Sequence, residues 1–272
     1  MLFAAFLTFL GLCALSSHSF AEAESHSLVV GIVPQQSATK LAANWTPVLE
    51  YLSKKSGLKL RFATAPNIPE FEKRCAAGSY DIAYMNPYHY TVFSKQPGYR
   101  AIAKEKLKSL KGILVVRKEN PIKDVKELDG STLAFPSPAA FAASILTRAY
   151  LAKRNVHFTP RYVSSHDSVY RAVAQGLLPA GGGVPRTFNN VAPDIRAQLR
   201  ILWMSKGYTP HAIALLPRVG TDTSTRILQA LMSMNDDPAA QPLLKKINFK
   251  GFAPATDDDW NDVRSLGIEL LQ

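Results

Sequence analysis

Residues 131–155, STLAFPSPAAFAASILTRAYLAKRN, decide the fold of this chain. The first five residues alternate like a short strand that enters a core, and Pro136-Ser137-Pro138 interrupts the pattern. From Ala139 on, small and apolar residues recur at helical spacing. The stretch therefore predicts a strand, a tight loop and a helix. Units of this kind build α/β folds, in which helices cover a largely parallel sheet.

The start of the predicted helix has the chemistry of an anion site. Ser137 is expected to cap the helix, and Pro138 suits its first turn. The backbone amides of Ala139, Ala140 and Phe141 would then point out of the N-terminus, where the helix dipole also attracts anions. Ligands of open α/β sheets bind beyond the carboxyl ends of the strands. We expect a small anion here; the alternative is an ordinary crossover that binds nothing.

The chain begins like an exported protein. Residues 2–15 form an apolar run too short to span a bilayer comfortably, and Ser19-Phe20-Ala21 follows as a small-x-small stretch. This predicts a signal peptide, residues 1–21, that is cleaved near Ala21. An uncleaved anchor and lipid attachment at Cys13 are the alternatives. Without the leader, Cys75 is the only cysteine, so no internal disulfide is expected.

The charge and composition narrow the classes of partner. With 272 residues and 47% hydrophobic side chains, the chain is long enough for one large domain or two modest ones. Its formal net charge of +11 is consistent with an anionic partner, because a positive field steers anions toward a cleft, but a solvated basic surface is the simpler account of most of these charges. The basic residues occur singly or in short clusters without interleaved aromatics, so a nucleic-acid partner is not expected.

Hydrophobic periodicity predicts two β-α-β sets along the chain. The expected strands are 27–33, 59–64, 80–85, 111–120, 157–163, 200–204 and 212–216, and the expected helices are 39–57, 67–78, 123–130, 168–175, 223–234, 238–246 and 257–271. The chain would cross between lobes near 111–116 and return near 211–216. We expect residues 22–113 and 212–272 to form lobe 1 and residues 114–211 to form lobe 2. Such lobes close on a ligand by hinge motion.

Five motifs carry a resemblance to a known family. They are GIVPQQSATKLAANWTPVLEYLSKKSG from residue 31, YDIAYMNPYHY at 80–90, ELDGSTLAFPSP at 127–138, SSHDSVYRAVAQG at 164–176 and GFAPATDDDWNDVR at 251–264. Together they resemble the periplasmic substrate-binding proteins of phosphate, phosphite and phosphonate importers, which have the two-lobed type 2 periplasmic binding fold. The resemblance implies a monomeric periplasmic receptor that captures a small anion, needs no cofactor, and delivers the anion to a membrane permease driven by a separate ATPase.

The resemblance also shows where this chain departs from the family pattern. Phosphonate binders of the family carry Ser and Thr at the helix start that matches Ala139 to Phe141. Their acidic residues that hold an aminoalkyl group fall near Arg186 and His211, and a further Asp falls near Pro179. These differences make 2-aminoethylphosphonate a poor candidate ligand.

The candidate ligand-binding residues lie at strand ends and helix starts. Tyr and Asn supply neutral donors, His can donate from its ring, and Arg can bind an oxyanion bidentately. The run of glycines at 181–183 predicts a close approach of the backbone to another group. The candidates are Gln35, Tyr84, Asn86, Tyr88, Ser137, Ala139, Ala140, His166, Arg186, Thr187 and His211. For each side chain the structural alternative remains: core aromatics, turns, helix caps at His166 or Asp167, or a surface charge.

Other classes of function fit the sequence less well. Tyr84, Tyr88, His89 and Tyr90 have groups that ferric-binding relatives of the fold employ, so ferric transport is an alternative. A receptor that reports its ligand to a membrane sensor is another. The sequence contains no GxxxxGK[ST] loop and no HExxH motif, and we expect no enzymatic activity.

Overall fold

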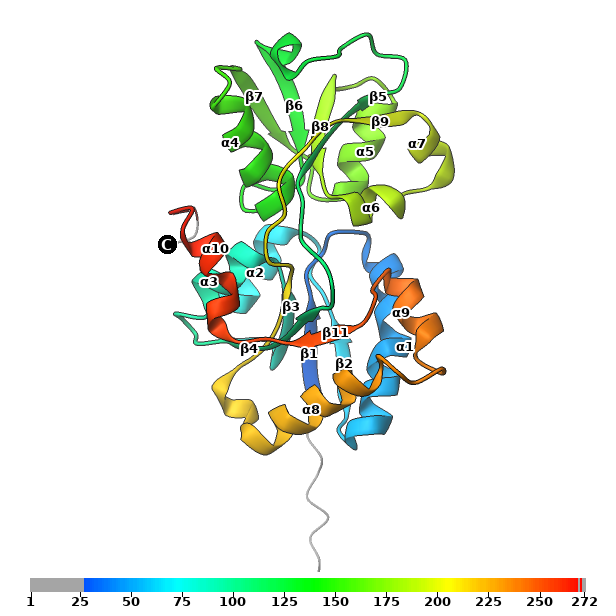
Figure 1. Cartoon of the computed structure of the whole chain (residues 1–272), viewed down its shortest axis with the longest axis vertical. Coiled ribbons are helices and arrows are strands. Elements are labelled where there is room, and N and C mark those ends of the chain that lie inside the picture. The colour runs from blue at the N-terminus through cyan, green and yellow to red at the C-terminus, as the bar shows by residue number, and fades with distance from the viewer. Residues whose placement is uncertain (1–26, 269, 271–272) are drawn as a thin grey trace, which may run out of the picture.

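The computed structural model describes residues 27–268 and 270 and consists of two lobes stacked along the long axis (Figure 1). The strands of lobe 1 are β1 (Leu28–Ile32), β2 (Leu60–Ala63), β3 (Ile82–Met85), β4 (Arg100–Glu105), β10 (Ala212–Leu215) and β11 (Phe252–Pro254). Those of lobe 2 are β5 (Ile113–Arg117), β6 (Ser131–Phe135), β7 (Phe158–Tyr162), β8 (Ala180–Gly183) and β9 (Leu199–Met204). The sheet orders are β11-β4-β10-β3-β1-β2 and β7-β6-β8-β5-β9. The expected two-lobed α/β architecture is confirmed. The predicted signal peptide lies outside the described residues.

Both sheets are mixed, although we expected them to be mainly parallel. The β-α-β cores are parallel, because β1 pairs with β2 and β3, and β6 pairs with β7 and β8. By contrast, β10 runs antiparallel to β3 and β4, and β5 runs antiparallel to β8 and β9. Both β5 and β10 enter their sheets directly from the other lobe, without the crossover helix that a parallel neighbour requires.

The helices cover both sheets, and several begin and end where the sequence predicts. Lobe 1 contains α1 (Ala38–Ser56), α2 (Ile68–Ala76), α3 (Pro87–Phe93), η3 (Pro217–Val219), α8 (Thr221–Ser233), α9 (Gln241–Ile247), η4 (Asp257–Trp260) and α10 (Asn261–Arg264). Lobe 2 contains η1 (Val125–Leu128), η2 (Phe141–Leu146), α4 (Thr147–Ala152), α5 (His166–Ala174), α6 (Pro185–Asn189) and α7 (Pro193–Ala197). Gly57 ends α1 in the left-handed conformation, and Asn67 caps α2 by accepting from the Glu70 amide. The predicted last helix, 257–271, was too long, because the 3₁₀ turn η4 continues only as the four-residue α10, which ends at Arg264 just before Gly267 in the left-handed conformation.

The predicted helix after Pro138 begins later than expected. Its first part, η2, is a π-helix, in which the Ala140 carbonyl accepts from the amides of Ser144 (2.7 Å) and Ile145 (3.3 Å). Ser137 does not cap it, since the Ser137 hydroxyl is buried without a partner and the N-cap residue is Ala140. Residues 138 and 139 instead form a turn, in which the Ala140 amide donates to the Ser137 carbonyl at 3.4 Å, and the helix starts only after this turn.

The glycines of β8 allow this π-helix to lie directly on the sheet. A Cβ atom at Gly182 would be 1.9 Å from the Ala143 carbonyl oxygen, and one at Gly112 would be 2.2 Å from the Ala142 carbonyl oxygen. The sequence correctly predicted a close backbone approach at the glycine run. However, the group that approaches is the backbone of η2.

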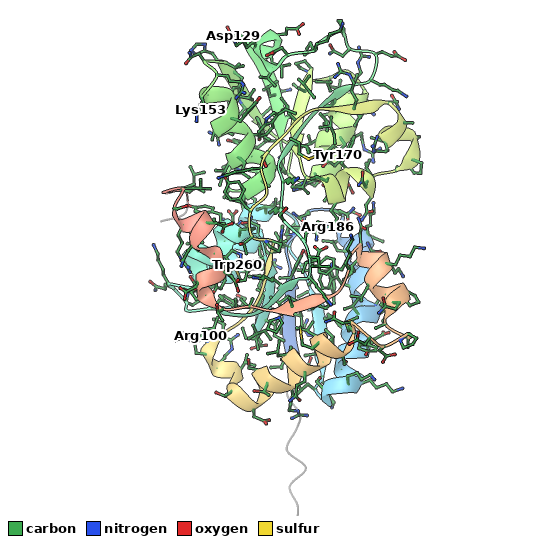
Figure 2. The ribbon with its side chains drawn as sticks, in the orientation of Figure 1. Arg100, Asp129, Lys153, Tyr170, Arg186 and Trp260 are labelled. Atoms are coloured by element: carbon green, nitrogen blue, oxygen red, sulfur yellow. The ribbon has the colours of Figure 1, made fainter. Side chains whose placement is uncertain are left out.

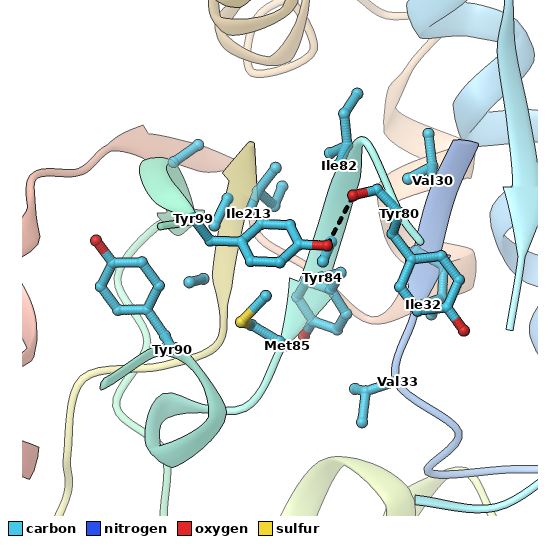
Figure 3. Packing of buried hydrophobic residues seen from close by; sticks show 14 of the residues in the cluster. Val30, Ile32, Val33, Tyr80, Ile82, Tyr84, Met85, Tyr90, Tyr99 and Ile213 are labelled. Atoms are coloured by element: carbon cyan, nitrogen blue, oxygen red, sulfur yellow. Dashed lines mark hydrogen bonds between the residues drawn. The ribbon is translucent and has the colours of Figure 1, made fainter. Parts of the chain in front are cut away.

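Two segments, 106–112 and 205–211, connect the lobes, as Figure 1 shows. They pair with each other, because the amides of Leu110 and Tyr208 each donate to the other residue's carbonyl at 2.7 and 2.9 Å. Below them, β1, β3 and β10 contribute Ile32, Ile82 and Ile213 to the lobe 1 core (Figure 3). The Tyr99 hydroxyl donates to the Tyr80 carbonyl at 2.7 Å in the same core. No helix among the described residues is long and apolar enough to cross a membrane.

Candidate functional site

A small enclosed cavity lies between the lobes, beyond the ends of β1 and β3. Its volume is about 10 Å³, which is room for about one water molecule. Its polar side chains are Gln35, Asn86, His166 and His211, and the rest of its wall is formed by Val33, Ile68, Leu110, Ala140, Phe141, Ala142, Ala143 and Val184. Four of the candidate side chains predicted from the sequence therefore meet at one place.

Lobe 2 presents the start of η2 to this cavity. The first amides of a helix have no partner within it, and here these are the amides of Phe141, Ala142 and Ala143. The Ala140 amide instead donates to the Ser137 carbonyl at 3.4 Å, so it is not the free donor that we expected. Ala139 lies outside the cavity wall and accepts at its carbonyl from Asn86 Nδ2 at 3.2 Å. The predicted donor amides were those of Ala139, Ala140 and Phe141, and in the structure the corresponding group is that of Phe141, Ala142 and Ala143.

Arg186 joins the two lobes behind the cavity. Its guanidinium donates to the Tyr84 hydroxyl (2.7 Å) and to Gln35 Oε1 (2.8 Å), and lies 3.6 Å from Glu105 Oε2. Figure 2 places Arg186 at the junction of the lobes. Burial opposes its charge, but the neighbouring Tyr84 and Glu105 raise the pKa of Arg186 overall. Arg186 was predicted to hold an oxyanion, but its hydrogen bonds in this structure go to lobe 1.

His211 is held against Tyr84 and Gln35. Its ring stacks on the Tyr84 ring with centroids 5.0 Å apart and planes 19° apart, and its Nε2 lies 3.1 Å from Gln35 Nε2. Burial, followed by the positive charge of Arg186, lowers the pKa of His211 well below its usual value. His211 is therefore neutral at physiological pH.

His166 forms the opposite wall at the first turn of α5. Its amide donates to the Gln35 carbonyl across the lobes at 3.2 Å, and its Nδ1 lies 3.1 Å from the Thr187 hydroxyl. Burial and the charge of Arg186 lower the pKa of His166 to about 3. Neither His166 nor Asp167 caps α5, because the Ser165 hydroxyl accepts from the Ser168 amide. Thr187 lies behind His166, outside the cavity wall.

Three other candidates are directed elsewhere. Tyr84 lies behind Gln35 and Arg186 and stacks on His211. Tyr88 is buried on α3 and lines a separate hollow beside α10. Ser137 lines a hollow at the rim between the lobes, together with Asn67 and Lys73. The helix that begins at Pro87 was not predicted, and it directs Tyr88 away from the cavity.

Sequence reasoning also missed two kinds of residue at this site. The apolar wall, including Phe141 and Val184, resembles any other core position in the sequence. Glu105, the buried partner of Arg186, ends the polar strand RAIAKE, which has no clear alternation of apolar residues. In the structure, Glu105 stands out as a charged residue that is only 4% exposed, which indicates that it has a buried partner.

The groups proposed for a ferric ion do not converge. Tyr84 bonds to Arg186, Tyr90 donates to Asp257, and His89 pairs with Glu72. Burial raises the pKa of Tyr84 to about 12, which disfavours the phenolate that a hard cation needs. Among the described residues no group of three His, Cys, Asp or Glu side chains is arranged to hold a metal ion.

The sequence of this two-lobed chain matches one group of known proteins. The family model for the periplasmic substrate-binding proteins of ABC phosphonate transporters matches residues 30–260. The chain belongs to this family. It is therefore the substrate-binding component of an ABC importer, with a membrane permease as its partner.

Individual members of the family are distant relatives. The phosphonates-binding periplasmic protein of Escherichia coli is 22% identical, over 97% of this chain and 82% of the relative. The binding protein component of an ABC phosphonate transporter from Pseudomonas aeruginosa has a TM-score of 0.82 at 16% identity, over 90% of this chain and 86% of that one. PhnD1 of Prochlorococcus marinus, solved with methylphosphonate, has a TM-score of 0.80 at 19% identity, over 89% and 97% of the two chains. At these identities the solved structures establish the fold, not the ligand.

Proposed function

We propose that this periplasmic protein captures a small phosphorus oxyanion, phosphite or a phosphonate with a small apolar substituent, in the cavity between its lobes. The observation that carries the proposal is the wall itself, where Phe141, Ala142 and Ala143, the first residues of η2, line the cavity together with neutral polar side chains of lobe 1. Backbone amides at a helix start stabilise an oxyanion without a competing side-chain charge.

The chemistry of the wall argues against a cationic substituent. Among the described residues, no carboxylate lines the cavity, and the nearby Glu105 pairs with Arg186 and Lys108. An ammonium group would lose its hydration without gaining a counter-ion, which is costly in a buried site. Phe141, Val184 and Ile68 instead offer contact to a hydrogen or methyl substituent. The same wall is why 2-aminoethylphosphonate should bind weakly.

The cavity must widen to accept the ligand. Its volume of about 10 Å³ suits a single water molecule, so the lobes separate by movement at 106–112 and 205–211 before an oxyanion enters. The ligand favours closure only as far as it binds the closed form more tightly than the open one. Delivery of the captured anion to the permease follows from membership of an importer.

A thermal-shift and calorimetric panel on the mature protein tests this function. It compares phosphite, methylphosphonate, phosphate, sulfate, 2-aminoethylphosphonate and ferric iron. A ligand present at one hundred times its dissociation constant stabilises the folded state by about 2.7 kcal/mol. We expect that effect from phosphite or methylphosphonate and a much smaller one from 2-aminoethylphosphonate. Binding of ferric iron alone, or of no phosphorus oxyanion, would contradict the proposal.

A further inference from the structure

A chain of polar contacts runs from lobe 2 through lobe 1 to the wall of the cavity. Arg186 Nη2 donates to Gln35 Oε1 at 2.8 Å, and Gln35 Nε2 lies 3.1 Å from His211 Nε2. Gln35 and His211 are buried, and the Arg186 side chain is only 12% exposed. Because Gln35 and His211 line the cavity while Arg186 does not, Arg186 contacts the polar wall of the cavity through Gln35.

The direction of every bond in this chain is fixed by one residue. A guanidinium can only donate hydrogen bonds, so the atom of Gln35 that faces Arg186 must be the amide oxygen. The amide nitrogen of Gln35 therefore faces His211 as a donor, and His211 Nε2 must accept. A neutral imidazole carries its single proton on the other nitrogen in that case, which is Nδ1.

We propose that Arg186 is a positioning residue, which acts through Gln35 to hold His211 as a neutral Nδ1–H donor to the bound oxyanion. This inference rests on the proposed function, because it assigns a role within the same cavity. It also changes the role of Arg186 from a direct ligand of the anion to a residue that sets the tautomer of a ligand-binding histidine. The anion itself is then bound by neutral donors. An ionised oxygen of the anion can accept a hydrogen bond from the Nδ1–H group of His211. A hydroxyl group of the ligand that pointed its hydrogen at Nδ1 would find a second hydrogen there and could not bond.

The groups around His211 support this assignment. Tyr84 stacks on the His211 ring, and its hydroxyl is held by the second arm of Arg186, so both contacts of the ring depend on the same guanidinium. The other charged groups in the vicinity, Glu105 and Lys108, pair with each other at 3.3 Å and do not line the cavity. His166 faces the cavity from α5 and is neutral. None of these groups supplies an acceptor that would draw the proton to Nε2.

Nitrogen-15 NMR of the histidine rings tests the tautomer directly. The Nδ1–H and Nε2–H forms give different ring-nitrogen shifts and coupling patterns, and the signals of His211 are identified by their loss in the His211→Gln variant. We expect wild-type His211 to carry its proton on Nδ1 at pH 7, with or without phosphite. A proton on Nε2 would overturn the proposal, whatever the protein binds.

A pair of charge variants tests the consequence for binding. In Gln35→Glu the carboxylate accepts from Arg186 and from His211, which moves the His211 proton to Nε2. Gln36→Glu is the matched control for a carboxylate placed near Arg186, because Gln36 is equally buried, its Nε2 has no partner, and it lines the neighbouring cavity beside Arg186 but not the cavity proposed for the anion. Loss of a hydrogen bond to a charged group corresponds to about a 10- to 100-fold loss of affinity.

We expect Gln35→Glu to weaken phosphite and methylphosphonate binding by about that factor relative to Gln36→Glu. The ring signals of His211 should switch to the Nε2–H pattern in Gln35→Glu alone. Equal affinities in the two variants would contradict the role of the Arg186–Gln35–His211 chain. A wild-type protein that binds neither anion would instead contradict the proposed function, and the NMR experiment would still decide the tautomer.

Discussion

Arg186 and Glu105 lie side by side at the junction of the lobes. Removing either one would deprive the charge of the other of this partner in a site away from water, which lowers the stability of the folded protein. Removing one partner of a buried ion pair typically lowers the free energy of unfolding by about 3–5 kcal/mol. Burial already raises the pKa of Glu105, although Arg186 and Lys108 act in the opposite direction. The carboxylate therefore depends on its cationic neighbours.

We expect Arg186→Ala to lower the free energy of unfolding by about 3 kcal/mol and also to weaken anion binding. Adding Glu105→Gln should recover more than half of the lost stability, because no buried charge then remains unpaired, but it should not restore binding. Urea unfolding of the single and double variants measures the coupling between the two residues. Strictly additive losses would show that the 3.6 Å contact contributes nothing to stability.

Individual site residues could be predicted from the sequence where the ends of strands and helices fix their position in the fold. Gln35, Asn86 and His211 lie at strand ends beside proline, and His166 lies at a helix start, so their approach to one cavity follows from the sheet order. The partners of Arg186 were not predictable in this way. They come from β1, β3 and β4, and only the antiparallel pairing of β10 with β4 brings Glu105 into reach.

At the scale of elements, η2 can pack directly on β8 because the glycines of β8 have no side chains. We expect Gly182→Ala to destabilise the protein by about 1–3 kcal/mol or more, because its Cβ would meet the Ala143 carbonyl and force η2 to move. Since η2 carries the donor amides, binding of phosphite should weaken as well. Gly130→Ala is the control, with a left-handed backbone but no atom near its Cβ, and it should leave binding unchanged. Unaltered affinity in Gly182→Ala would separate η2 from the ligand.

The elements that the sequence missed are short or polar. The unpredicted strands are β4, β8 and β11, and the unpredicted α-helices are α3, α6 and α7, none of which exceeds seven residues. A helix of one or two turns shows too little periodicity to distinguish it from a loop. The π-helical start of η2 was equally hidden, because η2 lies against Gly112 and Gly182, a contact that its own sequence does not reveal.

At the scale of the whole molecule, two segments connect the lobes and buried neutral groups bring them together. The chain was predicted to cross between the lobes near 111–116 and 211–216, and these ranges adjoin the connecting segments 106–112 and 205–211. The hydrophobic run of a strand is interrupted where the chain leaves one sheet for the other. Across the gap, the His166 amide bonds to the Gln35 carbonyl and Asn86 bonds to the Ala139 carbonyl. These two contacts use no charge, whereas Arg186 pairs with Glu105 across the same gap. Because that pair is largely buried, salt screens it little, and closure should depend little on salt.

The free energy of unfolding should instead depend on pH through His166. Its pKa is about 3 in the folded protein, against 6.5 for the ordinary side chain, so between these values the unfolded chain binds a proton that the folded protein does not. The stabilising contribution is complete above pH 6.5 and is lost as the pH falls toward 3. From pH 7 to pH 5 the loss amounts to about 2 kcal/mol for this residue. His211, whose pKa is also lowered by burial and by Arg186, acts in the same direction.

The histidine contribution is isolated by comparison with variants, because Glu105 has a raised pKa and acts in the opposite direction. We expect His166→Gln to lose about 2 kcal/mol less than the wild type between pH 7 and pH 5, as measured by urea unfolding at each pH. His157→Gln is the matched control, since the His157 side chain is 85% exposed on lobe 2 and should leave the wild-type profile in place. If His166→Gln showed the wild-type profile instead, His166 would take up a proton in the folded protein as readily as in the unfolded chain. Below pH 6.5 the lobes would then meet around a positive charge, and the neutral wall on which the ligand assignment depends would hold only above that pH.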